Sequence, residues 1–582
     1  MNKTTDPITL EIMRNALFSI ADEMTAALVR TAYSTNIKDR RDCSCAICTV
    51  NGEIVAQTEI GTPLHMGVMP GIVRVVLDQY PPETLKPKDV VITNLPYPAG
   101  PGHLSDITAV SPIYHKEDVV SVAASTAHHV DVGGYAPGSM PFGVTEIHQE
   151  GLQIPPVKIM KQGVIDEEIM ALIRQNVRTK AESRGDLMAQ IASNNVGARR
   201  IGELIGRHSV AHVQTYMEEI LDYAERSMIA GIQQLPQGRY SFEDYVEGDG
   251  ITDALIKIRA ALEIQEKRIR IDFTGTDPQV KGPMNARDTA ARACVYFVLK
   301  AVIDPDLPTN SGSYRPIDIV TPEGSLLQAK FPAAVCNSNI LTDQRVVDVL
   351  LGALMQAVPE RVVAACSGEM NLINVGGIHP RTDEYYNYVE TYGGGQGAMW
   401  DQDGMDGVHT HLTNTRNAPV EVIESTYPLR VERYGLVPDS EGSGEHRGGC
   451  GMVREIVMLG KETKFTLSAD RREIGPWGAF GGRAAKTSDC LVISPDGKMK
   501  RLPSKVTTTL GRDEKVTIVT PGGGGWGDPF KRAPSKVGWD VLEGLVSPER
   551  ARDIYGVAVD PETGEMDVEG TDRLRRRPLP SN

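Results

Sequence analysis

The chain is short of aromatic residues, of cysteines and of long apolar runs. Phe, Trp and Tyr make up 5% of its 582 residues, against 57 glycines, so we expect backbone-rich loops to carry much of the function. Eight cysteines in a chain of this length argue against a secreted disulfide scaffold. No stretch reaches the length of a membrane span and no signal sequence opens the chain, which predicts a cytoplasmic protein.

Positive charge and nucleotide motifs are also scarce. Lys and Arg number 61 against 76 Asp and Glu, a net charge of -15 that argues against non-specific binding to nucleic acids or anionic membranes. No GxxxxGK[ST] motif is present, and residues 481–487 only approach it. We therefore predict that this chain alone neither binds nor hydrolyses ATP.

Changes in hydrophobic periodicity predict a large α+β fold of several domains, with helices and strands N-terminally and a glycine-rich, β-rich C-terminal region. The length allows two to four domains around a large core. The predicted regions are 1–238, metal-binding with long helices; 239–418, mixed; 419–530, β-rich; and 531–582, a loosely held basic tail.

Several elements can be predicted from spacing. Ile8 to Tyr33 is expected to be a helix, because apolar residues recur at helical spacing after Asp6-Pro7. Cys43 to Gln57 alternates, and Asn51-Gly52 predicts a two-residue hairpin turn. The remaining predictions are buried strands at Val90–Asn94 and Val119–Ala124, helix from Glu167 to Leu235 broken near Asn194-Asn195, strands from Arg239 to Thr274, and mixed structure over 285–370.

Two polar segments each follow a predicted buried strand. The first contains His103 and Asp106, whose three-residue separation can direct both side chains at one ion. The second contains His128, which precedes a glycine pair. Imidazole with carboxylate is a donor set that suits Zn²⁺, Mn²⁺ or Fe²⁺ with an open position for water. The alternative is that His103 caps a turn and Asp106 caps a helix.

Other polar residues leave alternatives open. His129 and Asp131 follow His128, but adjacent residues on a strand face opposite ways, so one histidine is expected to bind a metal and the other to orient it or the substrate. Asp42 is either a further ligand or the partner of a neighbouring arginine. Cys43, Cys45 and Cys48 lack zinc-knuckle spacing and are interpreted as small buried residues, with Cys43 and Cys45 on one face.

Glycine-rich segments at 393–397 and 521–527 have two interpretations. Their backbone N–H groups could enclose an anion. Alternatively, residues 521–527 form a packed corner in which Trp526 covers bare backbone.

The motifs together resemble the hydantoinase B family, the B-type subunits of ATP-dependent hydantoinases, lactamases and 5-oxoprolinases. Acetone and acetophenone carboxylase large subunits are more distant relatives. The resemblance extends over about Asp6 to Pro529, and the segments that carry it are 37–45, 102–106, 127–134, 138–141, 150–156, 414–421 and 520–529. One local departure is the loop 94–102, which is longer than the Gly-Gly-Thr-like loop of relatives.

The resemblance implies a metal site formed by Asp42, His103, Asp106 and His128, with Zn²⁺ as first choice and Mn²⁺ as second. It implies an A-type partner with an actin-like ATP fold that phosphorylates the amide oxygen or an enolate, in a heterotetramer with two copies of each subunit. Metal-activated water would then open a hydantoin, oxoproline or lactam ring. His129 or Asp131 would orient the water or relay protons, with His65 as a weaker candidate.

Two rival interpretations remain. One is the large subunit of an ATP-dependent ketone carboxylase, in which the metal binds an enolate-like species and CO₂ is added. The other is a non-catalytic chain that only stabilises its partner.

Overall fold

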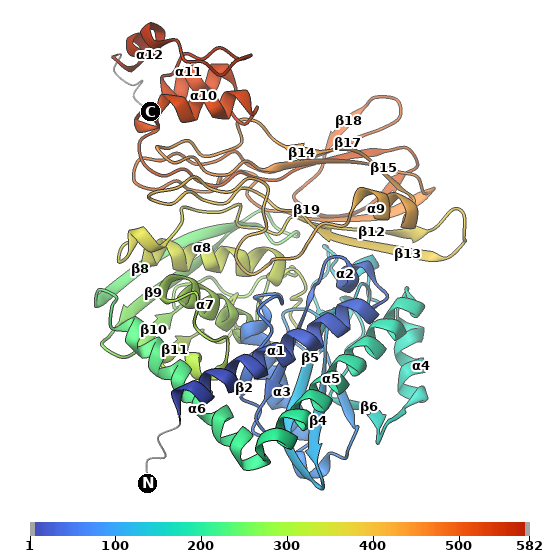
Figure 1. Ribbon diagram of the computed structural model, residues 1–582. Helices are drawn as coiled ribbons and strands as arrows, with labels where there is room; N and C mark the ends of the chain where they lie inside the picture. Colours follow the sequence, from blue (N-terminus) through green and yellow to red (C-terminus); the bar gives the residue numbers. More distant parts are fainter. Residues whose placement is uncertain (1–5, 577–582) are drawn as a thin grey trace.

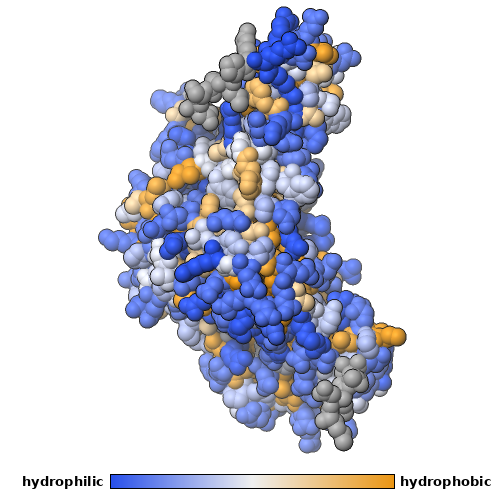
Figure 2. All heavy atoms as spheres, turned by 90° about the vertical axis from the view of Figure 1, so that its left-hand side faces the viewer, coloured by the Kyte–Doolittle hydropathy of each residue, from blue (hydrophilic) through white to orange (hydrophobic). Residues whose placement is uncertain are grey.

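The computed structural model describes residues 6–576, which form an α+β fold of several sheets with helices (Figure 1). Two sheets and most of the helices make up the lower half of Figure 1, and two further sheets make up the upper half. The face shown in Figure 2 is mostly hydrophilic, and hydrophobic side chains appear on it in small groups. Within residues 6–576, no helix is long and apolar enough to cross a membrane.

The first sheet carries the predicted metal residues. Its seven strands are antiparallel in the order β2-β1-β5-β4-β3-β6-β7. Helices α1 (Pro7–Thr31) and α5 (Lys180–His208) cover one face, and α3 (His65–Gln79) packs against the other. The strand bounds are β1 Cys43–Cys48, β2 Ile54–Gln57, β3 Val90–Thr93, β4 Asp106–His115, β5 Asp118–His128, β6 Val157–Lys161 and β7 Val164–Ile165.

The predicted first helix is confirmed as α1 (Pro7–Thr31), and the Asp6 side chain caps it by accepting from Thr9 N–H. The predicted apolar stripe is wrong in the first turn, where Ile8 and Ile12 are 72% and 57% exposed. The buried face contains Met13 instead. Met13 lies four residues before Leu17 and seven before Ile20, so it shares their face of the helix, whereas Ile12 lies one position away from that face.

The predicted β1–β2 hairpin is confirmed, but its turn is longer than two residues. Thr49 N–H donates to Glu53 O and Gly52 N–H donates to Thr49 O, so the chain turns over more than Asn51 and Gly52. Cys43 and Cys45 pack on the α1 side of the sheet and Cys48 on the α3 side, which confirms their assignment as buried residues on opposite faces.

The predicted helix break at Asn194-Asn195 is wrong. The region forms α4 (Glu167–Asn176), α5 (Lys180–His208) and α6 (Val210–Ile232), so the breaks fall at residues 177–179 and at Ser209, which has a φ of 84°. Asn194 does not interrupt α5, because its side-chain amide donates to Ala109 O and Ser111 Oγ on β4 rather than competing for the helix backbone.

The second sheet lies beyond a layer of helices. Its order is β11-β10-β9-β8, and helices α7 (Asp288–Ile303) and α8 (Asp343–Leu354) lie between it and α3. One hydrophobic core extends from β1 through α3, α7 and α8 to this sheet, so regions 1–238 and 239–418 share it, and the boundary at 238 stays a prediction. The strand bounds are β8 Gly238–Glu247, β9 Leu255–Ile264, β10 Ile269–Asp272 and β11 Ile317–Val320.

The upper sheets face one another across a separate core that contains Tyr388, Phe465 and Ile456. Their orders are β13-β12-β16-β19 and β14-β15-β20-β17-β18, and α9 (Val420–Thr426) packs beside β14. The strand bounds are β12 Leu372–Ile378, β13 Tyr385–Thr391, β14 Leu429–Leu436, β15 Met452–Met458, β16 Glu462–Ser468, β17 Asp489–Ile493, β18 Met499–Arg501, β19 Lys505–Gly511 and β20 Lys515–Val519.

The glycine-rich segments pack against one another instead of forming an open anion loop. A Cβ on Gly523 would lie 2.0 Å from Gln396 O, and one on Gly395 would lie 2.0 Å from Gly449 O. The N–H groups of Gly523 and Gly524 donate to Gly449 O and Ala365 O. Trp526 is 7% exposed, so the packed corner is the interpretation that the structure supports.

The C-terminal region is not the loosely held tail that the sequence predicted. Helices α10 (Pro534–Leu542), α11 (Pro548–Tyr555) and α12 (Val568–Arg575) form the unit at the top of Figure 1. Buried Val537, Val541, Val546, Ala551, Tyr555 and Val557 give it a core of its own. Arg575 donates to Arg532 O, whereas Arg577 lies outside the described residues.

Candidate metal centre

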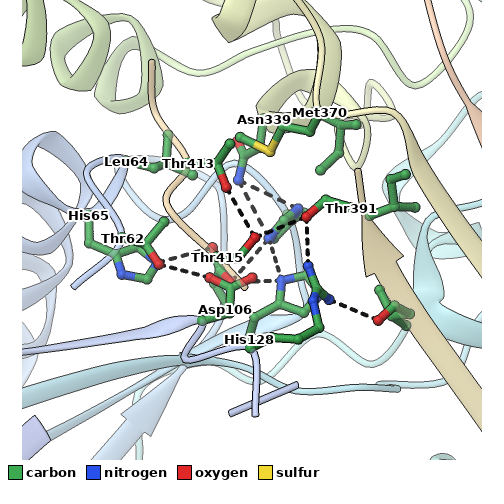
Figure 3. Close-up of a pocket in the computed structure, with 16 residues that line it drawn as sticks. Thr62, Leu64, His65, Asp106, His128, Asn339, Met370, Thr391, Thr413 and Thr415 are labelled. Atoms are coloured by element: carbon green, nitrogen blue, oxygen red, sulfur yellow. Dashed lines mark hydrogen bonds and ion pairs between the residues drawn. The ribbon is translucent and has the colours of Figure 1, made fainter. Parts of the chain in front are cut away.

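Three of the predicted ligands meet on the first sheet. His103 Nε2 lies 3.0 Å from Asp106 Oδ1, His128 Nδ1 lies 3.1 Å from the same oxygen, and the two ring nitrogens are 3.0 Å apart (Figure 3). Asp106 begins β4, His128 ends β5, and the two residues are directly paired in the antiparallel register. The pairing of these strands therefore joins the two polar segments that the sequence separates.

The triangle has the dimensions of a metal-binding face. An ion with bonds of about 2.1 Å has ligand–ligand edges of about 3.0 Å in an octahedron and about 3.4 Å in a tetrahedron. The observed edges of 3.0, 3.0 and 3.1 Å match the octahedral value. Two imidazoles and one carboxylate on one face leave the opposite positions open for water or substrate.

Contacts behind the triangle orient its members. His103 Nδ1 lies 3.3 Å from Cys336 O, an acceptor that selects the tautomer with a proton on Nδ1 and a free lone pair on Nε2. Asn339 Nδ2 lies 3.4 Å from His103 Nε2. A Cβ at position 102 would lie 1.7 Å from Asn339 Oδ1, so Gly102 permits this close approach.

Burial and charge oppose each other at the triangle. Burial disfavours the Asp106 carboxylate, but the His103 charge and the close contacts of His103 and His128 outweigh it and hold the pKa of Asp106 well below its usual range. Burial likewise disfavours protonated His103, but Asp106 overcomes this and raises the pKa of His103. Asp106 is thus kept anionic, the form that binds a cation.

Asp42 lines the same cavity but is not one of the three converging groups. Its carboxylate accepts a hydrogen bond from Thr62 Oγ1 at 2.9 Å, and its carbonyl accepts from His128 N–H at 3.1 Å. The expected alternative, an ion pair with a neighbouring arginine, does not occur among the described residues. Its role as a fourth ligand stays a prediction.

His65 also lines this cavity, although the sequence analysis gave it less weight than His129 and Asp131. It is the first residue of α3, is 1% exposed, and has Nδ1 2.8 Å from Ser44 Oγ. Its Nε2 lies 3.8 Å from Asp106 Oδ2. The His65 ring therefore lies beside the triangle.

His129 and Asp131 lie elsewhere. His129 points to the α5 side of the sheet, with Nε2 3.0 Å from Gln190 Oε1, and burial lowers its pKa. Asp131 accepts from Gly133 N–H, Gly138 N–H and Arg178, and burial raises its pKa. Neither residue lines the cavity, and their proposed role in proton transfer stays a prediction.

The sequence analysis did not identify the residues, distant along the chain, that form the other walls of the metal cavity. The segment Ser338–Thr342 is a π-helical turn that carries Asn339, a geometry often found at functional sites. Arg40, Thr391, Thr413 and Thr415 also line the cavity. The motif at 414–421, to which the sequence analysis assigned no role, is the one sequence signal that could have pointed to Thr415.

A second and larger cavity adjoins the first. Its volume is about 230 Å³ and it shares Thr62 with the metal cavity. Met66, Phe297 and Ala301 supply apolar walls, and Lys300 supplies a cation. The space is sufficient for a small ring beside the triangle.

Comparisons with known proteins agree with this architecture. A Pseudomonas protein named as a B-type D-/L-hydantoinase subunit is 32% identical over 99% of this chain and 98% of its own length. The 5-oxoprolinase of Dictyostelium discoideum is 36% identical over 90% of this chain but only 40% of its own length. The crystal structure of ATP-dependent caprolactamase from Pseudomonas jessenii superposes with a TM-score of 0.90 at 30% identity, covering 99% of this chain and 100% of that chain.

Nucleotide-free acetone carboxylase shares the fold, with a TM-score of 0.90 at 19% identity over 98% of this chain and 82% of that one. The family model for hydantoinase B/oxoprolinase matches residues 6–529. This match covers all four sheets and every side chain of the metal triangle, and the chain therefore belongs to the hydantoinase B/oxoprolinase family.

Proposed function

We propose that this chain is the metal-binding subunit of an ATP-dependent cyclic-amide hydrolase that opens a hydantoin, oxoproline or lactam ring. The observation that carries the proposal is the His103–Asp106–His128 triangle, which offers two nitrogens and one carboxylate oxygen beside a cavity large enough for a small ring. Three relatives carry the names hydantoinase, 5-oxoprolinase and caprolactamase, which refer to enzymes that act on such rings.

The residues that line the two cavities have different roles in this proposal. His103, Asp106 and His128, with Asp42 as a fourth donor, would hold a divalent cation, Zn²⁺ or Mn²⁺. Such an ion polarises a carbonyl carbon and lowers the pKa of water to about 7. His65 holds or moves a proton at Nε2, because Ser44 fixes its other nitrogen and it faces the reacting side of Asp106. The apolar walls of the adjoining cavity would pack against the ring.

The partner would supply ATP chemistry. Single-chain 5-oxoprolinases are longer than this chain, which matches only 40–42% of their length. The part of those proteins that this chain does not match would correspond here to a separate A-type subunit. The proposed assembly contains two copies of each chain. The glycine segments, whose N–H groups are used internally, are consistent with an ATP site on that partner.

A carboxylase subunit is the second candidate, because the fold also matches acetone carboxylase. This chain covers all of the caprolactamase chain but 82% of the acetone carboxylase chain, which favours the hydrolase.

The test is to co-express the chain with a candidate A-type, ATP-binding subunit and to assay cyclic amides and ketones with ATP, with and without bicarbonate. We expect ring opening that needs ATP and metal but no bicarbonate. Bicarbonate-dependent consumption of a ketone would establish the carboxylase instead. Turnover that survives His103→Ala with full metal occupancy would show that the triangle is not the reacting site and that the chain has a supporting role.

A further inference from the structure

Arg40 is a buried cation without a counter-ion. Its side chain is 1% exposed and lines the metal cavity, yet no carboxylate lies within 4.0 Å of it among residues 6–576. Removing a charge from water costs several kcal/mol unless it is paired or fully hydrogen-bonded. A bound anion would supply the missing partner.

The hydrogen bonds of Arg40 are incomplete. Nη1 donates to Asn36 Oδ1 and to Val389 O at 2.9 Å, and Nη2 donates to Thr391 Oγ1 at 2.8 Å. A guanidinium has five N–H groups, so two remain, and Nε is buried without a partner. These contacts hold the planar group in place and leave part of it free for a ligand.

Hydroxyl groups extend this cation along the cavity wall. Thr391 Oγ1 lies 3.0 Å from Thr415 Oγ1, which lies 3.3 Å from Thr413 Oγ1. All three threonines line the metal cavity and appear around it in Figure 3, with Asp106 and His128. Arginine and hydroxyl donors are the groups that proteins use to bind phosphate oxygens.

The charged and titratable groups around Arg40 do not contact it directly, although Asp42 and Asp106 line the same cavity. His409 is the nearby ring, and burial with the charge of Arg40 lowers its pKa to about 4, so it is neutral at physiological pH. Asp42 lines the same cavity beyond ion-pair distance and is engaged by Thr62. Among residues 6–576, no carboxylate therefore occupies the free N–H groups of Arg40.

We propose that Arg40, with the hydroxyls of Thr391, Thr413 and Thr415, binds a tetrahedral oxyanion beside the metal triangle, either inorganic phosphate or a phosphoryl group carried by the substrate. The identity of the phosphoryl source rests on the proposed function, whereas anion binding itself does not. The proposal adds no covalent step, because it assigns binding and charge compensation only.

The first experiment measures calorimetric binding of inorganic phosphate to the isolated, folded chain. Arg40→Met is expected to weaken binding about 10- to 100-fold through the loss of charge-assisted hydrogen bonds, and Arg40→Lys to restore part of it. Arg287→Met is the matched control, because Arg287 also has no carboxylate within 4.0 Å in the described part of the chain and donates to backbone carbonyls, but lies outside the cavity. Its phosphate binding should equal that of the wild type.

A second variant separates binding from folding. Thr391→Val keeps the shape of the side chain and removes the hydroxyl, and should weaken phosphate binding several-fold. Thr466→Val removes one hydroxyl of the Thr466–Thr507 pair, also 3.0 Å apart but outside the cavity, and should have no effect.

The second experiment measures kcat and KM with the partner, ATP and a cyclic amide. A fall in kcat for Arg40→Met at full metal content, without phosphate binding to the isolated wild type, would identify the ligand as a substrate phosphoryl group. A folded Arg40→Met protein that matches the wild type in both experiments would overturn the proposal and leave the proposed function intact. If the wild-type complex opens no ring, the proposed function fails, and phosphate binding alone decides the role of Arg40.

Discussion

Replacing Asp106 by Asn tests the metal centre most directly, because it keeps the shape of the side chain and removes one charge. Asp106 Oδ1 is 3.0 Å from His103 Nε2 and 3.1 Å from His128 Nδ1, so it forms two edges of the triangle. An amide oxygen is a weaker ligand, and we expect the variant to lose the metal. Its loss should remove the stabilisation that metal binding gives to the folded state.

The size of this effect can be worked out from linkage. Free metal at 1,000 times its Kd stabilises the folded state by about 4.1 kcal/mol. An entropy of unfolding of about 2.1 cal/mol/K per residue gives about 1.2 kcal/mol/K for 582 residues, so metal should raise Tm by about 3 °C. Asp106→Asn should show almost none of this shift.

The assay is differential scanning calorimetry with and without chelator, alongside metal analysis. Asp131→Asn is the matched control: Asp131 is equally buried and lies just beyond β5, the strand that ends at His128, but it accepts hydrogen bonds from Arg178 and the glycine loop. This variant should lose stability whether or not metal is present and should keep the metal-dependent shift of about 3 °C. A full shift in Asp106→Asn, or its loss in Asp131→Asn, would refute the assignment of ligands.

Three further outcomes are expected. His65→Gln should lower kcat by about 10²- to 10⁴-fold at normal metal content, and the same loss in His129→Gln but not in His65→Gln would assign proton transfer to His129 instead. Gly523→Ala, whose Cβ would meet Gln396 O at 2.0 Å, should cost at least about 3 kcal/mol by denaturant unfolding, whereas Gly202→Ala, with open space in α5, should stabilise by about 0.5–1 kcal/mol. Burial raises the folded-state pKa of Glu369 to about 8, so its contribution to stability is complete below pH 4.5 and is lost as pH rises to 8; Glu369→Gln should flatten that part of the pH–stability curve.

Local pattern determined much of the secondary structure and part of the centre. The spacing of apolar residues and the Asp6-Pro7 start predicted α1, and alternation predicted the β1–β2 hairpin, because these preferences act within one or two turns of chain. The His103-x-x-Asp106 pair was recognisable because both donors lie on a few consecutive residues. The two faces of β1 followed from the strand period of two, which sorted Cys45 from Cys48.

The tertiary structure decided what long-range pairing controls. Register between β4 and β5 sets His128 opposite Asp106, and Asn339 reaches His103 from a π-helical turn more than 200 residues away. In the sequence Asn194 indicates a helix break, but in the structure its side chain donates to the backbone of β4 and the helix continues. The C-terminal segment resembles a polar tail in sequence, but its few apolar residues form a core. Arg40 shows the same dependence on tertiary structure. Its burial in the wall of the metal cavity, without a carboxylate in direct contact among residues 6–576, results from the packing of distant segments around it.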